Sequence, residues 1–417
     1  MNLFALFVAL PFITCHEIEN HLKLGGRMKR TVTAEWTIMV YMSGDNELER
    51  YGCETIEKEF SVLGSTEKVQ VVGLFDRSPS HAKRAGDWVG TQVFHATRGM
   101  TATSGMADWG TRNMGNVSTL VDFVTWTKER SPANKYMLVF WGVGGFWHPG
   151  ISMRDESSSD SLDMNELHAA LPSLGKIDVV AYDTSHSASV ELATLWQGTA
   201  DAIVFSEDEV VGTAGINYDV VIQKLNLAPT MSSEDLAIVM SQSAESAKTF
   251  SAVALDSRFD ALLAAISRWG NALLRGILSY GNGHPGGAGP LVSLSNRQKY
   301  RQAFESAKSF GTFSTDKDIF SAVTAIRNLG YKEPYGVDTE KIKGAGQALL
   351  EALAATVVDF HSSESNEWGY GMTLNIISCL PTARSTNHDF YKVLKFANST
   401  SWVRFISSFA IEPGCDY

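Results

Sequence analysis

Apolar residues in the first half of the chain are grouped into short, nearly continuous runs. Such runs are typical of strands that a parallel sheet buries on both faces. The runs cover residues 36–42, 69–75, 136–141, 177–182 and 202–206. Amphipathic segments that favour helices lie between them, at residues 47–63, 117–130 and 162–174. This alternation predicts βαβ crossovers and therefore a mainly parallel sheet flanked by helices.

The second half of the chain has a more helical pattern, and a glycine-rich stretch at residues 281–289 precedes it. One further strand is expected at residues 371–377. A chain of 417 residues is longer than one ordinary core requires. We therefore expect an α/β core over residues 34–280 and a C-terminal part, residues 281–417, that packs on this core.

The first fifteen residues carry no charged side chain and include an apolar run from Leu3 to Ile13. This run is too short to span a bilayer, but it has the length of the apolar region of a signal peptide. We expect a signal peptide at residues 1–15 and a secreted chain that is not held in a membrane after cleavage. The alternative is a buried N-terminal segment.

Cleavage after Cys15 would leave Cys53, Cys379 and Cys415. An odd number of cysteines in an oxidising compartment leaves at least one outside an intramolecular disulfide. We predict a disulfide between Cys379 and Cys415, because it would fix the C-terminal tail. Glycosylation sequons at Asn116 and Asn398 are also compatible with a secreted glycoprotein.

The formal net charge of −11 argues against a nucleic-acid-binding protein, which would carry a basic stripe. No cysteine and histidine cluster has the spacing of a zinc site, and no glycine-rich loop follows a nucleotide-binding pattern. The sequence therefore predicts neither a nucleic-acid partner nor a zinc or nucleotide cofactor.

Two loops follow neighbouring strands of the predicted sheet. Residues 140–147 read FWGVGGFW, and residues 182–191 read YDTSHSASVE. Ligands of open parallel sheets bind beyond the carboxyl ends of the strands. A nucleophile and its base would therefore lie in these two loops.

Both loops resemble motifs of the clostripain family of cysteine peptidases, whose members typically read W-x-H-G-x-G-W and D-A-C-L-M-A-S-V-E. The histidine position falls on Val143 and the cysteine position on Ser185. The resemblance extends over roughly residues 34–410. It implies a caspase-like three-layer α/β sandwich with a C-terminal helical extension, in which the dyad lies at the ends of adjacent strands. The matching residues are Trp141, Gly144, Asp183, Ser189, Val190 and Glu191.

The two substitutions remove the chemistry of a cysteine peptidase. Attack by cysteine requires a thiolate, whose formation a neighbouring imidazole favours. The hydroxyl of Ser185 needs a general base within hydrogen-bonding distance, and the isopropyl group of Val143 offers none. His186 is adjacent to Ser185, and side chains of adjacent residues in an extended segment point opposite ways. His148 lies in the first loop and could fold back to supply a base.

The family's acidic pocket residues select Arg or Lys before the cleaved bond, and Asp183 matches one of them. The alternative interpretation of Asp183 is a structural turn residue. A second acidic position falls on Thr213 and Ala214, where this chain departs from the family pattern.

Some relatives need calcium, and the loop after the third strand is acidic. Its spacing fits no EF-hand pattern, because it lacks the glycine and the closing glutamate. Solvated loop carboxylates and helix caps are the favoured interpretation, so no metal site or cofactor is expected. The acidic residues are Asp155, Glu156, Asp160 and Asp163.

Our leading hypothesis is a secreted pseudopeptidase that binds a peptide or a partner protein through the former cleft. One alternative is an active hydrolase that uses Ser185 or another base and cleaves after basic residues. Another is a diverged copy, that is, a paralogue of such a peptidase that has drifted in sequence and has no selected ligand. A binding protein should keep an open groove around Asp183 and Ser185, whereas a diverged copy should fill it with Val143 or Trp147.

Overall fold

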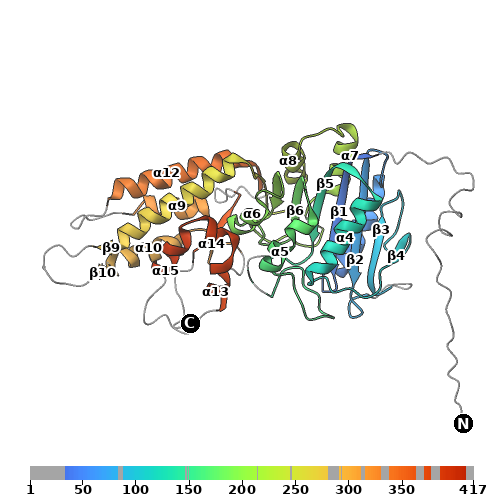
Figure 1. The fold of residues 1–417 in the computed structure, drawn as a ribbon, viewed down its shortest axis with the longest axis horizontal. Coiled ribbons are helices and arrows are strands. Elements are labelled where there is room, and N and C mark those ends of the chain that lie inside the picture. Colours follow the sequence, from blue (N-terminus) through green and yellow to red (C-terminus); the bar gives the residue numbers. More distant parts are fainter. Residues whose placement is uncertain are drawn as a thin grey trace, which may run out of the picture. The chain divides into compact units, whose positions relative to one another are not determined.

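The structure, a computed structural model, describes residues 33–82, 88–145, 148, 150–213, 215–244, 247–279, 291–292, 294–310, 315–329, 338–362, 371–376 and 386–409. Its central feature is a nine-stranded sheet with the order β12-β8-β7-β6-β5-β1-β2-β3-β4 (Figure 1). The strands are β1 Ala34–Gly44, β2 Val69–Arg77, β3 Gly90–His95, β4 Met106–Asp108, β5 Ala133–Trp141, β6 Val179–Asp183, β7 Ala202–Phe205, β8 Thr249–Ala254 and β12 Val357–Ser362.

The strands at the centre of the sheet, β7-β6-β5-β1-β2, are parallel. Antiparallel strands extend both edges, with β8 and β12 on one side and β3 and β4 on the other. All the predicted buried runs fall on the parallel strands, which confirms the predicted sheet. The pattern did not reveal β8, because its sequence TFSAVA mixes polar and small residues.

Helices cover both faces of the sheet. α4 Val117–Arg130 and α5 Met164–Leu174 cover one face and lie in front of the strands in Figure 1. Tyr41 of β1 packs with this group, whereas its neighbour Val40 packs with the helices of the other face. This arrangement is the three-layer sandwich that the resemblance implied. The helices of the other face are α2 Glu49–Thr55, η1 Ile56–Phe60, α3 Ser61–Leu63, α7 Tyr218–Leu227 and α8 Ser233–Ser243.

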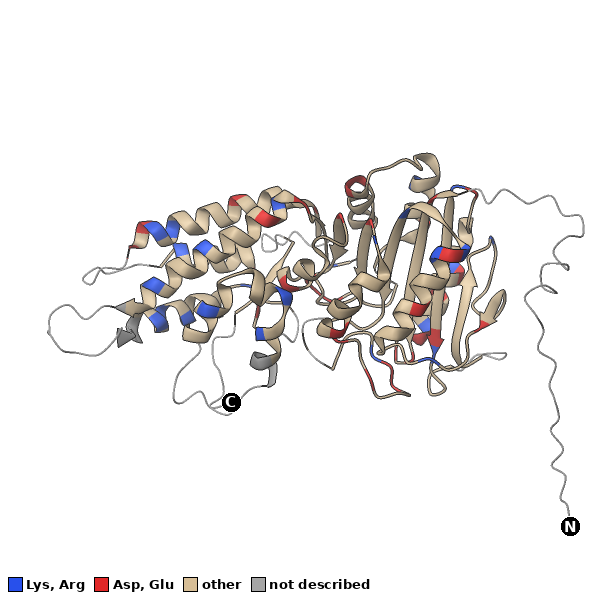
Figure 2. Ribbon diagram, in the orientation of Figure 1, with Lys and Arg blue, Asp and Glu red and all other residues tan. Residues whose placement is uncertain are grey.

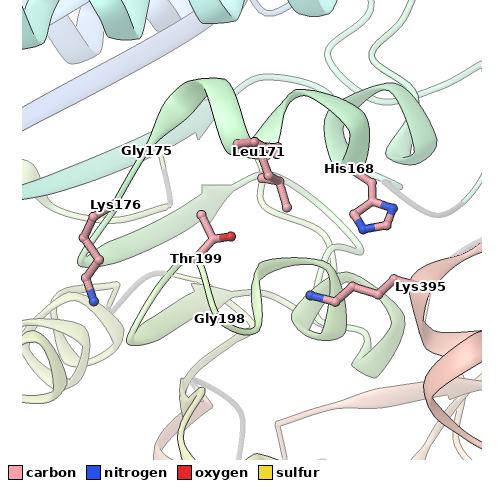
Figure 3. A pocket seen from close by; sticks show the side chains of 8 residues that line it. His168, Leu171, Gly175, Lys176, Gly198, Thr199 and Lys395 are labelled. Atoms are coloured by element: carbon pink, nitrogen blue, oxygen red, sulfur yellow. The ribbon is translucent and has the colours of Figure 1, made fainter.

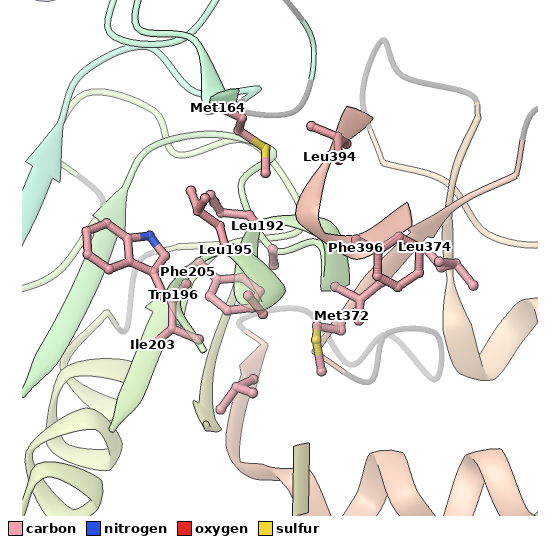
Figure 4. Packing of buried hydrophobic residues seen from close by; sticks show 14 of the residues in the cluster. Met164, Leu192, Leu195, Trp196, Ile203, Phe205, Met372, Leu374, Leu394 and Phe396 are labelled. Atoms are coloured by element: carbon pink, nitrogen blue, oxygen red, sulfur yellow. The ribbon is translucent and has the colours of Figure 1, made fainter. Parts of the chain in front are cut away.

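A helical part from the second half of the chain packs against α6 (Val190–Trp196) and β7. Figure 4 shows Leu195 and Trp196 of α6 in one apolar cluster with Leu374 and Phe396. The predicted division between residues 34–280 and 281–417 stays a prediction. The remaining elements are α9 Ser257–Ile277, β9 Leu278–Ser279, β10 Leu291–Val292, α10 Leu294–Ser306, β11 Asp316–Asp318, α11 Ile319–Arg327, α12 Thr339–Thr356, β13 Thr373–Asn375, α13 Thr386–Val393, α14 Lys395–Ser399 and α15 Trp402–Phe409.

Charged residues of both signs occur in the sandwich and in the helical part (Figure 2). None of the described helices combines the length and the apolar character that crossing a membrane requires. The predicted signal peptide at residues 1–15 and the predicted Cys379–Cys415 disulfide lie outside the described residues.

Candidate functional site

Strands β5 and β6 are parallel neighbours that end at the same edge of the sheet. Their register pairs Trp141, the last residue of β5, with Asp183, the last residue of β6. Val143 and Ser185 each follow two residues later, so they hold corresponding positions in adjacent loops. The structure therefore brings together the two positions that the sequence comparison assigned to a nucleophile and its base.

The two loops are in direct backbone contact. The N–H of Gly145 donates a hydrogen bond of 3.2 Å to the carbonyl oxygen of Ser185. A Cβ at Gly144 would lie 1.6 Å from that same oxygen, so this position has no room for a side chain. Gly145 has a φ of 87°, which glycine adopts without steric cost. The glycines therefore allow the loop after β5 to lie directly on the loop after β6.

The hydroxyl of Ser185 has its hydrogen-bond partners in a third loop. The N–H of Val210 donates to Ser185 Oγ over 3.0 Å, and Ser185 Oγ donates to the carbonyl oxygen of Val210 over 3.4 Å. In the part of the chain that the structure describes, no imidazole forms a hydrogen bond with Ser185 Oγ. The hydroxyl is thus held by backbone groups, and no general base among these residues is hydrogen-bonded to it.

Two histidines belong to these loops, and both have partners of their own. The Nε2 atom of His148 lies 3.0 Å from Oδ2 of Asp316, and this pair is buried. The Nδ1 atom of His186 lies 3.1 Å from the carbonyl oxygen of Glu207. His148 therefore contacts β11 and does not form the contact with Ser185 that the hydrolase hypothesis needs.

Val143 is half-buried, and its backbone is also fixed. Its carbonyl oxygen accepts a hydrogen bond of 2.9 Å from the N–H of Met153. Among the described residues, the N–H groups of Gly144 and Ser185 donate no hydrogen bond. Val143 and Ser185 themselves supply neither an imidazole nor a thiolate, and these two N–H groups have no acceptor among the described residues.

Asp183 is a buried carboxylate beneath residues 215–218. Its Oδ2 accepts a hydrogen bond of 2.7 Å from the Tyr218 hydroxyl, and its Oδ1 accepts a longer one, 3.4 Å, from the Ile216 N–H. A Cβ at Gly215 would lie 1.8 Å from Oδ1, so glycine is needed for this close approach. Burial raises the pKa of Asp183 to about 6.

A second carboxyl group, which the sequence did not indicate, lies on the other side of Tyr218. Glu59 Oε2 accepts a hydrogen bond of 2.9 Å from the Tyr218 N–H. Burial raises the pKa of Glu59 to about 8, and the charges of Asp183 and Asp219 contribute to the rise. Glu59 lines a cleft of about 580 Å³ together with Gly215 and Asp219. The sequence did not indicate this role for Glu59, because the residues that contact it are remote in the sequence.

Comparison with known families identifies the relatives of this chain. The model of the clostripain family, peptidase C11, matches residues 40–275, which is more than half of the chain. The chain belongs to the clostripain family. Clostripain from Hathewaya histolytica is 24% identical over 230 residues, which is 48% of this chain and 44% of clostripain. The match thus spans less than half the length of that relative.

Solved structures of C11 proteases share the fold. An inactive zymogen C11 protease from Parabacteroides distasonis superposes with a TM-score of 0.61 at 16% identity, covering 88% of this chain and 98% of its own. A secreted C11 cysteine protease from Bacteroides thetaiotaomicron, solved with an irreversible peptide inhibitor, has a TM-score of 0.61 at 17% identity, with coverages of 88% and 99%. These likenesses confirm the caspase-like fold with its C-terminal helices.

Two residues that match the clostripain-family motif have structural contacts here. Ser189 caps α6 by accepting a hydrogen bond of 3.2 Å from the Leu192 N–H. Glu191 is fully buried, and its Oε1 accepts hydrogen bonds from the Tyr391 hydroxyl at 2.7 Å and the Asn375 N–H at 3.0 Å. Glu191 therefore joins the sandwich to the C-terminal part.

Both predicted glycosylation residues are exposed in this clostripain-family chain. Asn116 caps α4, and its side-chain oxygen accepts a hydrogen bond of 2.9 Å from the Ser118 N–H. Asn398 lies in the short helix α14. Glycosylation at these two residues stays a prediction.

The acidic loop after β5 divides into solvated and buried carboxylates. Asp163 caps α5, as the sequence interpretation proposed, and Asp160 and Glu156 are exposed. The interpretation was wrong for Asp155, which is 1% exposed and faces Asp45 and Asp76. Asp45 follows β1 and Asp76 lies in β2, so the spacing of residues within the loop could not reveal this cluster.

A separate cleft of about 380 Å³ lies where β6 and β7 begin, at the edge of the sheet opposite Ser185. Figure 3 shows His168, Thr199 and Lys395 around it. The Lys395 ammonium donates to the carbonyl oxygens of Leu195 and Gln197. This cation therefore stabilises the end of α6.

Proposed function

We propose that this clostripain-family chain is a secreted pseudopeptidase that binds a peptide or protein partner through the region of the former active site, at the loops of residues 142–145 and 183–187. The proposal rests mainly on the places of Val143 and Ser185 in the sheet. Trp141 and Asp183 are paired at the ends of neighbouring strands, and Val143 and Ser185 follow them by two residues each. These are the positions at which a histidine and a cysteine would act together.

Peptidase chemistry requires groups that these positions do not carry. Valine has no proton acceptor, and a serine hydroxyl needs a general base to become a nucleophile. Ser185 Oγ is bonded to the backbone of Val210, and His148 is bonded to Asp316. No described contact favours the alternative of an active serine hydrolase.

Features of the same loops support binding of a peptide. The N–H groups of Gly144 and Ser185, which donate to no described residue, would suit a peptide carbonyl oxygen. Val211, next to the residue that holds Ser185, is 62% exposed and offers an apolar contact. The similar protein from Bacteroides thetaiotaomicron is a secreted protease that was solved with a peptide inhibitor, which is compatible with a secreted peptide-binding relative.

The nearby carboxyl groups favour a basic ligand side chain. Glu59 and Asp219 line the cleft of about 580 Å³, and Asp183 lies directly beneath Gly215 at its edge. Lys58 and Lys224 also line this cleft, and the ammonium of Lys58 is paired with Glu54. A guanidinium or ammonium group in this cleft would lower the pKa of Glu59 and gain a charged partner. We therefore propose a preference for peptides that carry Arg or Lys.

The test compares the purified natural chain with a Val143→His/Ser185→Cys double variant. Fluorogenic peptides that end in Arg or Lys measure hydrolysis, and fluorescence polarisation of the same peptides measures binding. We expect the natural chain to bind them without cleavage and the double variant to cleave them. Peptides that end in Glu are the matched control and should bind at least about tenfold more weakly.

Two results would contradict the proposal in different ways. Hydrolysis by the natural chain that Ser185→Ala abolishes would identify a serine hydrolase. His148→Ala would then show whether that imidazole is the base. Absence of binding to any of the peptides, together with an inactive double variant, would favour the diverged copy without a ligand. Trp147, which could fill the groove in that case, lies outside the described residues.

A further inference from the structure

The sandwich and the C-terminal part meet along β13. The Thr373 N–H donates a hydrogen bond of 2.8 Å to the carbonyl oxygen of Ala188, just before α6. Figure 4 shows Met372 and Leu374 in one apolar cluster with Leu192 of α6. We call this contact of α6 and its flanking loops with β13, β11 and α13 the junction. Its apolar surroundings leave little water to solvate a charge.

Two glutamates of the sandwich are buried in the junction. Glu191 of α6 is fully buried, and Glu207, two residues after β7, is 2% exposed. Glu191 Oε1 accepts hydrogen bonds from the Tyr391 hydroxyl and the Asn375 N–H. Glu207 Oε2 accepts one of 3.1 Å from the Gly371 N–H. Both carboxyl groups therefore hold the C-terminal part through neutral donors, which supply no positive charge.

One oxygen of each glutamate has no hydrogen bond in the described part of the chain. These buried atoms are Glu191 Oε2 and Glu207 Oε1. Neither glutamate forms an ion pair with a Lys, Arg or His among the same residues. A buried carboxylate without a cationic partner costs free energy, which the protonated form largely avoids. Burial accordingly raises the pKa of Glu191 to about 7 and raises the pKa of Glu207 well above its ordinary value.

Further acidic groups face the two glutamates. The charge of Asp316 in β11 raises the pKa of Glu191, and the charges of Asp318 and Asp208 raise that of Glu207. Asp316 and Asp318 are themselves buried. A charged Glu191 or Glu207 would therefore be repelled by carboxylates as well as poorly solvated.

The basic groups near the junction do not form ion pairs with these glutamates. The imidazole of His148 is bonded to Asp316, and that of His186 to the carbonyl oxygen of Glu207. The ammonium of Lys308 lowers the pKa of Glu207, but its effect is smaller than that of burial. The ammonium groups of the other basic residues nearby have partners elsewhere; these residues are Lys248 and Lys317. Deprotonation of the glutamates would thus add charge to a region that is already acidic.

We propose that the junction is a pH-sensitive clamp, closed while Glu191 and Glu207 are protonated and loosened when they become charged. Protonation lets the C-terminal part pack firmly on the sandwich, whereas deprotonation places charges beside Asp316 and Asp318 in an apolar region. The pKa of Glu191 is raised from 4.5 to about 7. Its stabilisation of the closed junction is therefore complete below about pH 4.5 and is lost as pH rises through about 7.

The clamp is connected to the former active site. His148 belongs to the loop after β5 that also carries Val143, and its imidazole lies 3.0 Å from Asp316 of β11. Movement of β11 away from the sandwich would break this contact and give the loop of Val143 more freedom. The region of the former active site would thus respond to pH through the junction.

Hydrogen–deuterium exchange of the purified full chain at about pH 6 and about pH 8.5 tests the clamp. Mass spectrometry gives protection factors, which divide out the direct effect of pH on exchange. We expect the protection of residues 371–376 to fall on the order of tenfold at the higher pH, because the closed junction retains a proton on Glu191 up to about pH 7. Residues 34–44 of β1, at the centre of the sheet, are the internal reference and should change less.

Glu191→Gln should remove most of this fall, because glutamine has the shape of the protonated carboxyl group and does not titrate. Glu351→Gln is the matched control, since Glu351 is an exposed carboxylate of α12 in the C-terminal part, and this variant should keep the fall. If Glu191→Gln does not fold, Glu207→Gln takes its place. The clamp is refuted if residues 371–376 lose no more protection than β1 in the natural chain, or if the glutamine variant that folds retains the whole fall.

Discussion

The carbonyl oxygen of Ser185 occupies the space that a side chain at Gly144 would need. A Cβ at Gly144 would lie 1.6 Å from this oxygen and less than 3 Å from the carbonyl carbon and the nitrogen of the same residue. All three atoms belong to the backbone, so no change of rotamer can relieve the overlap. Any residue other than glycine at position 144 would therefore force the two loops apart.

Gly144→Ala should lower the free energy of unfolding by about 2–4 kcal/mol, because the loops after β5 and β6 can no longer pack together. Urea denaturation measures this loss. The matched control is Gly344→Ala, which lies in α12 with open space around the new methyl group. Alanine should stabilise that helix by about 0.5–1 kcal/mol. Equal stability of the Gly144→Ala variant and the natural chain would refute the close packing.

Tyr218→Phe should destabilise the chain more at pH 8 than at pH 5. The Tyr218 hydroxyl donates to Asp183, whose pKa is raised by burial to about 6, so the carboxylate is charged only at the higher pH. Loss of a hydrogen bond to a charged group costs about 1.5–3 kcal/mol, whereas loss of one to a neutral group costs about 0.5–1.5 kcal/mol. Urea denaturation at both pH values measures the difference.

Tyr136→Phe provides the control for this comparison, since its hydroxyl accepts a hydrogen bond from the neutral N–H of Ala133. Its cost should not change between the two pH values. An equal cost of Tyr218→Phe at pH 5 and pH 8 would mean that Asp183 does not change its charge in this range.

Glu59→Gln should stabilise the chain at alkaline pH and have little effect near pH 5. The pKa of Glu59 is raised from 4.5 to about 8, so the folded chain retains a proton that the unfolded chain has released. Stability is therefore lost as pH rises from about 4.5 to about 8, and glutamine removes this loss. We expect a gain of at most about 5 kcal/mol at pH 9, since the pKa is raised by about 3.5 units and one unit corresponds to about 1.4 kcal/mol.

Thermal unfolding of the Glu59→Gln variant from pH 5 to pH 9 tests this prediction. Glu67→Gln, a change at an exposed carboxylate, is the control and should follow the natural chain throughout. A stability difference between Glu59→Gln and the natural chain that stays constant over this range would contradict a raised pKa of Glu59.

Local patterns in the chain were sufficient to predict the centre of the fold. Buried parallel strands have nearly continuous apolar sequences, so each of the central strands could be recognised from a few neighbouring residues. Their carboxyl ends then identified the loops of Val143 and Ser185, which the register of Trp141 with Asp183 places side by side. The substitutions at Val143 and Ser185 could be recognised from the sequence alone, because the spacing of residues within a motif does not depend on the fold.

Contacts between segments that are far apart in the sequence became apparent only in the tertiary structure. Glu59 and Asp183 meet at Tyr218, and Asp155 meets Asp45 and Asp76, across separations that no periodicity records. His148 pairs with Asp316 of the C-terminal part, although its sequence position allowed it to approach Ser185. Strand and helix periods constrain near neighbours, whereas burial, pKa shifts and ligand geometry depend on which distant side chains the packing brings into contact.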